Sequence, residues 1–127
     1  MQKIICLDFD GVIHSYTSKF TTHDVIADGP VPGALRAILG YLGAGYDVAI
    51  LSSRSNYRSG RKAMQQWLIF HLRKNFHHID PEYIVHQQIL WPISKPPAII
   101  TIDDRAVTFK GTFPTIEEIQ SFKPWNK

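Results

Sequence analysis

The sequence of 127 residues contains a single cysteine, and this scarcity limits the kinds of protein it can encode. One cysteine excludes an internal disulfide, so we expect a protein of a reducing compartment, the cytoplasm. Cys6 lies inside a short apolar run, "IICL". That position predicts a buried and unreactive thiol rather than a nucleophile or a metal ligand.

Long apolar runs are also missing. No stretch approaches the ~18 apolar residues that a membrane span needs, and the first apolar run is too short for a secretory signal. We therefore expect no membrane partner.

The sequence has no internal repeat and no low-complexity linker, so residues 1–127 are expected to form one domain. No G-x-G-x-x-G follows the first apolar run, which disfavours a nicotinamide-binding protein.

The charge is only mildly unbalanced, with a formal net charge of +3 and an isoelectric point near 9.1. Such a balance permits an anionic partner, including nucleic acid, but does not require one. Basic residues gather in "RSNYRSGRK" and "HLRKNFHH". Taken alone, each cluster is explained by the solvated face of a helix.

Apolar segments alternate with segments of helical periodicity along the chain. Short, apolar segments rich in β-branched residues predict strands at 3–8, 46–53, 82–87 and 97–104. Apolar residues at helical spacing predict helices at 33–43 and 60–74. This alternation predicts an α/β fold, a doubly wound Rossmann-like parallel sheet with helices on both faces. Residues 12–30, which end in a Pro- and Gly-rich stretch, are expected to form a loop or small hairpin.

One further helix start is indicated near the end of the chain. Thr115 lies three residues before Glu118, which is the spacing of a capping box. We expect Ile116 and Ile119 of this helix to face inward.

Carboxylates stand where the predicted strands end. Asp8 and Asp10 follow the first strand, and Asp103 and Asp104 follow the last. The carboxyl ends of parallel strands meet at one edge of a sheet, where α/β proteins bind ligands. Several carboxylates in one place repel each other unless a cation neutralises them. Oxygen ligands of this kind suit Mg²⁺, which is commonly shared between carboxylates and a substrate phosphate.

Four short motifs in this order resemble those of the haloacid dehalogenase-like (HAD) phosphohydrolases. They are "IICLDFDGV", "VAILSSR", "SKPP" and "ITIDDR", and they span residues 4–105. The large cap domain of many members is missing, so the chain is similar to the capless branch, with residues 12–30 as a minimal lid. The resemblance implies a Mg²⁺-dependent phosphatase of the cytoplasm. Its substrate would be a phosphorylated small molecule or a nucleic-acid end, because capless members include polynucleotide 3′-phosphatases.

The resemblance also implies roles for the motif residues. Asp8 would be the nucleophile that forms an aspartyl-phosphate, and Asp10 would protonate the leaving group and later activate water. Asp8, the backbone carbonyl of Asp10 and Asp103 would bind Mg²⁺. Asp104 would reach the metal through water or orient Lys95, whose ammonium would offset the phosphoryl charge.

The phosphoryl oxygens need further donors. Ser52 would supply a hydroxyl because it follows the apolar run directly, although Ser53 is one residue away and either could serve. The Ser53 amide would add a donor, and Gly11 would let the backbone approach the phosphate. For Arg54, a phosphate contact and a structural ion pair are both open.

Two alternatives belong to other classes. A non-catalytic module of the same fold could bind metal, phosphate or nucleic acid, but all four catalytic positions are intact. A phosphoacceptor receiver domain also uses aspartate and Mg²⁺. There the acidic pair would follow the first strand and the lysine the last, which is not the order in this chain.

Overall fold

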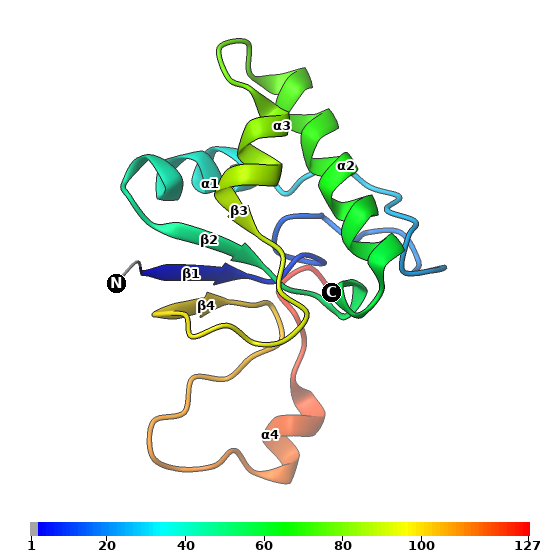
Figure 1. Ribbon diagram of the computed structural model, residues 1–127. Helices are drawn as coiled ribbons and strands as arrows, with labels where there is room; N and C mark the ends of the chain where they lie inside the picture. The colour runs from blue at the N-terminus through cyan, green and yellow to red at the C-terminus, as the bar shows by residue number, and fades with distance from the viewer. Residues whose placement is uncertain (1–2) are drawn as a thin grey trace.

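A computed structural model describes residues 3–127, and its centre is a four-stranded sheet in which all strands are parallel (Figure 1). The strands are β1 (Ile4–Leu7), β2 (Asp47–Ile50), β3 (Ile89–Leu90) and β4 (Ile100–Ile102). Their spatial order is β3-β2-β1-β4. The chain therefore moves outward from β1 through β2 to β3 and then returns to the other side of β1. This order confirms the α/β class and the parallel sheet.

The prediction of a third strand at 82–87 is wrong, because this segment is helical. It forms α3 (Pro81–Tyr83) and a π-helical turn, η2 (Ile84–Gln88), and the strand begins only at Ile89. Local capping explains the difference: the Asp80 side chain accepts a hydrogen bond from the Tyr83 amide, and a proline opens the helix. The apolar residues that suggested a strand are buried within this helical turn instead.

The two main helices lie where the periodicity predicts them, as α1 (Ala34–Gly43) and α2 (Arg58–Asn75). Both pack on the face of the sheet formed by alternate residues of β1 and β2, where Ile5 pairs with Val48 and Leu7 with Ile50. The helical side chains in this core are all at least nine-tenths buried: Leu35, Ile38, Met64, Leu68 and Leu72. The expected apolar stripe of the second helix is therefore core packing.

Helices cover one face of the sheet rather than both. Figure 1 shows α1, α2 and α3 on the same side. The connection from β3 to β4, residues 91–99, contains no helix, so the expected second helical layer does not form. Cys6, which points to the opposite face from the core residues of β1, is 2% exposed. Burial raises the pKa of its thiol, and the expectation of a buried cysteine is confirmed.

The last helix, α4 (Ile116–Ser121), has the predicted capping box, in which Thr115 and Glu118 exchange hydrogen bonds. The prediction for its apolar side chains is wrong, because Ile116 is 67% exposed and Ile119 is 58% exposed. Figure 1 shows the reason: α4 lies apart from the sheet, on a long excursion of the chain beyond β4. A helix without a neighbour has nothing against which to bury its apolar side.

Residues 12–30 form a loop that is tied to the core rather than a regular hairpin. Backbone hydrogen bonds join Ser15 to Gly29 and Val31 to Ile13 at its base. Its only ladder contacts in the described part of the chain are isolated bridges at His14. Within residues 3–127, no helix combines the length and apolar character that crossing a bilayer requires.

Candidate functional site

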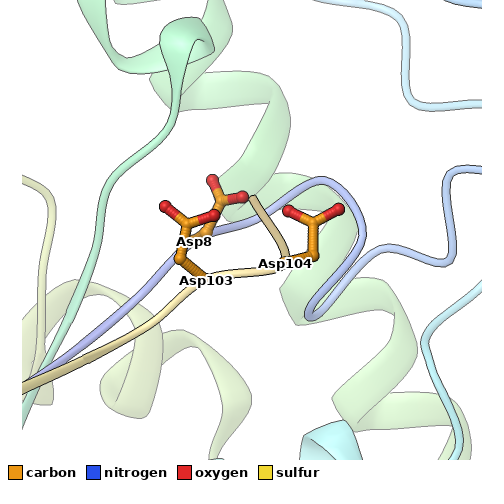
Figure 2. A group of neighbouring side chains, drawn as sticks. All are labelled: Asp8, Asp103 and Asp104. Carbon is orange, nitrogen blue, oxygen red and sulfur yellow. The ribbon is translucent and has the colours of Figure 1, made fainter. Parts of the chain in front are cut away.

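Three carboxylates meet where β1 and β4 end. Asp8 follows β1, and Asp103 and Asp104 follow β4, which pairs directly with β1. Each side chain offers one oxygen within 4.8 Å of those of the other two, and Figure 2 shows the three carboxylates turned to the same side. The strand order reverses between β1 and β4, and such reversal points are where open α/β sheets bind ligands. The predicted convergence of four carboxylates is confirmed for Asp8, Asp103 and Asp104 but not for the side chain of Asp10.

The protein environment makes ionisation of Asp8 unfavourable. Burial and the neighbouring charge of Asp103, together with contact and charge from Asp104, raise the pKa of Asp8 to about 8, although a hydrogen bond from the Phe9 amide opposes this. The ordinary value is 3.8. A carboxylate in such a position needs a positive charge beside it to be ionised at neutral pH.

Asp104 is held against the backbone of Gly11. Gly11 has a φ of +86°, and a Cβ atom there would overlap the Asp104 carboxylate. The Asp104 side chain is only 3% exposed, and its Oδ1 has no hydrogen-bond partner. Arg105 Nε lies 3.9 Å from the other oxygen. Gly11 thus admits a buried carboxylate whose inward oxygen still lacks a partner.

The donor set fits a hard divalent cation. It consists of carboxylate oxygens alone, one of them buried and without a hydrogen-bond partner, at a point where burial and neighbouring carboxylates raise the pKa of Asp8. Asp103 stays accessible, and its Oδ1 accepts a hydrogen bond from the Arg105 amide at 2.8 Å, which orients the side chain. A cation at this position would satisfy all three residues at once.

Asp10 does not join these three carboxylates. Its side chain instead accepts hydrogen bonds from His14 Nδ1 at 2.8 Å and from Arg54 Nε at 2.9 Å. His14 Nε2 accepts from the amide of Asp28, so the ring proton lies on Nδ1 and points to Asp10. Burial disfavours the charged form of Asp10, but these two donors outweigh it and the pKa of Asp10 is lowered. The Asp10 side chain is therefore engaged outside the cluster of three carboxylates.

Arg54 forms the ion pair that was one of its two open roles. The residue is 1% exposed, which leaves no surface for a substrate phosphate. Its Nη1 donates to the carbonyls of three loop residues, Thr22, His23 and Val25. Gly60 permits this arrangement, since a Cβ there would overlap the Arg54 carbonyl. Arg54 therefore ties the loop of residues 12–30 to Asp10.

Three further predicted residues lie in the segments that follow β2 and precede β4. Ser52 caps the 3₁₀ turn η1 (Ser53–Asn56), and its Oγ accepts from the Arg54 amide, which leaves the hydroxyl proton free to be donated. Ser53 is exposed at the start of that turn. Lys95 is exposed in the 91–99 connection. Its positive charge is one of the influences that lower the pKa of the Cys6 thiol.

Two residues at the end of the chain also reach the site, and sequence reasoning missed them. Trp125 Nε1 donates to the carbonyl of Gly11 at 2.7 Å, and Asn126 Nδ2 donates to the carbonyl of Ser15 at 3.0 Å. The chain thus returns over more than a hundred residues to hold the turn after β1. No periodicity or spacing in the sequence signals this contact.

Comparison with protein-family models, with curated proteins and with solved structures finds no match to this chain.

Proposed function

We propose that the protein is a Mg²⁺-dependent phosphomonoester hydrolase of the HAD type that works through an aspartyl-phosphate on Asp8. The observation that carries the proposal is the meeting of Asp8, Asp103 and Asp104 at the reversal point of the sheet. Bound there, Mg²⁺ would neutralise the charge of the carboxylates and of the phosphoryl group. The substrate would be a phosphorylated small molecule or a nucleic-acid end.

The proposed chemistry has two steps. An oxygen of Asp8 attacks phosphorus while the bond to the leaving oxygen breaks, and the leaving oxygen takes a proton from Asp10. Water then attacks the same phosphorus, the bond to Asp8 breaks, and Asp10 takes the proton of the water. The hydrogen bonds from His14 and Arg54 lower the pKa of Asp10 and favour its carboxylate, which is the form that the second step needs. For the first step Asp10 would therefore take up a proton from solvent before it passes one to the leaving oxygen.

Charge neutralisation and positioning fall to the surrounding groups. The Ser52 hydroxyl, whose oxygen already accepts from the Arg54 amide, would donate its proton to a phosphoryl oxygen. Lys95 is exposed and forms no ion pair with any residue of the described range 3–127, so its ammonium is available to a phosphate.

The test is release of phosphate from an aryl phosphate with Mg²⁺ and with EDTA. We expect turnover only with Mg²⁺ and loss of at least a thousandfold in Asp8→Asn, because the nucleophile is gone. Asp47→Asn is the matched control, since Asp47 begins β2 at the opposite edge of the sheet. Unchanged turnover in Asp8→Asn would exclude the scheme. Metal binding without turnover would favour the non-catalytic module instead.

A further inference from the structure

The outer side of α2 is strongly basic. Between Arg58 and Asn75 the helix carries five Arg or Lys residues and no Asp or Glu. Its first half borders a hollow of about 430 Å³ whose lining is entirely polar or basic: Arg58, Arg61, Lys62, Gln65, Gln66 and His86. A second, shallower hollow adjoins it and is lined by Asn56, Tyr57, Arg58, Ser59 and Lys62. We call the two together the α2 groove; no acidic side chain of the described residues lines it.

The charge in the α2 groove is only partly engaged by contacts within the protein. At the far end of the helix, Arg73 pairs with Glu82 at 3.3 Å. Arg61 is partly engaged, since its Nη1 donates to the carbonyl of Ser55. Arg58 and Lys62 are exposed and form no ion pair with a residue in the described part of the chain. At least two cations are therefore free to contact an anionic partner.

An aromatic platform stands at the end of the groove that lies toward the site. Tyr57 is 52% exposed and stacks on His23, with ring centroids 3.9 Å apart and an interplanar angle of 11°. His23 Nε2 and Ser59 Oγ lie 2.8 Å apart, which fixes the histidine ring. One face of Tyr57 thus packs on a ring that Ser59 holds in place before any ligand arrives, and the exposed surface of Tyr57 is a preformed place for another flat ring.

The groove begins at the edge of the sheet that bears the carboxylates. β2 ends at Ile50, η1 follows at Ser53, and α2 starts at Arg58. Figure 1 shows this end of α2 beside the carboxyl ends of the strands, with the rest of the helix rising away from them. A chain lying along the α2 groove would therefore run toward the site.

We propose that the α2 groove binds single-stranded nucleic acid, with backbone phosphates on Arg58 and Lys62 and one base stacked on Tyr57. Free cations along a groove, combined with an exposed aromatic ring, are the means by which proteins hold single strands without reading sequence. An anionic bilayer fits less well, because the lining offers no aliphatic or Trp side chain to insert. Binding in the groove does not depend on whether Asp8 catalyses a reaction.

The experiment is a titration of a fluorescein-labelled 15-nucleotide oligo(dT) with the whole protein in EDTA, followed by anisotropy at several salt concentrations. Each phosphate contact contributes about 0.7 to the slope of log K against log salt for single strands. The double variant Arg58→Gln/Lys62→Gln should therefore reduce the slope by about 1.4 and weaken binding at least tenfold at low salt. Tyr57→Ala should weaken binding roughly tenfold, and Tyr57→Phe should retain it.

The matched control is Lys3→Gln/Lys110→Gln, which changes the net charge equally at two exposed positions away from the groove. It should leave the slope and the affinity nearly unchanged. Equal losses in both double variants would overturn the proposal, since binding would then follow net charge alone. Absence of binding to oligo(dT) at low salt would overturn the proposal too. So would a higher affinity for phosphatidylserine vesicles, measured by co-sedimentation, than for oligo(dT). Asp8→Asn should bind oligo(dT) normally, which separates this test from that of the proposed function.

Discussion

Replacing Asp8 by a side chain that cannot ionise should make the metal-free protein more stable, although it removes the proposed nucleophile. The pKa of Asp8 is raised from 3.8 to about 8, first by burial and then by the charge of Asp103. Between these two values the unfolded chain loses the proton while the folded protein keeps it. The free energy of unfolding therefore falls as the pH rises through this window.

The magnitude follows from the width of that window. From the ordinary value to pH 7 is roughly three pH units, and each unit corresponds to about 1.36 kcal/mol, so the penalty at pH 7 reaches about 4 kcal/mol. This figure is a ceiling, because the asparagine amide must still find hydrogen-bond partners of its own. With about 4 °C per kcal/mol for a chain of this length, Asp8→Asn should raise Tm at pH 7 by about 5–15 °C.

The assay is thermal unfolding in EDTA at pH 4 and at pH 7, with the two variants Asp8→Asn and Asp47→Asn. The gain in Asp8→Asn should be large at pH 7 and small at pH 4, where Asp8 is neutral in the folded protein. Mg²⁺ should raise the Tm of the unsubstituted protein at pH 7, because binding at a hundredfold excess over Kd adds about 2.7 kcal/mol to the free energy of unfolding. Mg²⁺ should not raise the Tm of Asp8→Asn. An Asp8→Asn protein no more stable than its parent at pH 7 would refute the reasoning.

Two further substitutions test the framework of the site. Gly11→Ala should abolish phosphatase activity and lower the Tm measured by thermal unfolding, because the added Cβ would overlap Asp104 at a φ of +86°. The control is Gly40→Ala in α1, where the added Cβ meets no other atom; its free energy of unfolding should rise by about 0.5–1 kcal/mol. Arg54→Met should lower the free energy of unfolding, measured in urea, by about 3–5 kcal/mol, because it leaves Asp10 buried without its cation. A loss below about 1 kcal/mol would show that Asp10 does not depend on this pair.

Local sequence signals predicted the parts of the fold that local interactions determine. The strands at β1, β2 and β4, the helices α1 and α2, and the capping box of α4 all lie where apolar spacing or capping residues place them. The prediction of a strand at 82–87 failed because a short apolar run suits a buried strand and a buried helical turn equally. In α4, periodicity correctly aligned Ile116 and Ile119, but no periodicity can state whether another element covers that side.

The candidate site, too, could be predicted only in part from the sequence, because its assembly depends on the order of the strands. Carboxylates after the first and last strands were visible in the sequence, but only the order β3-β2-β1-β4 places β4 beside β1 and brings Asp103 within reach of Asp8. The parallel arrangement alone would allow β4 to lie at the far edge, three strands away. At about 4.8 Å per strand, the two carboxylates would then be ~14 Å apart, too far to share one ion. The cluster of three carboxylates therefore depends on the topology: the aspartates meet only because β4 has crossed back to lie beside β1.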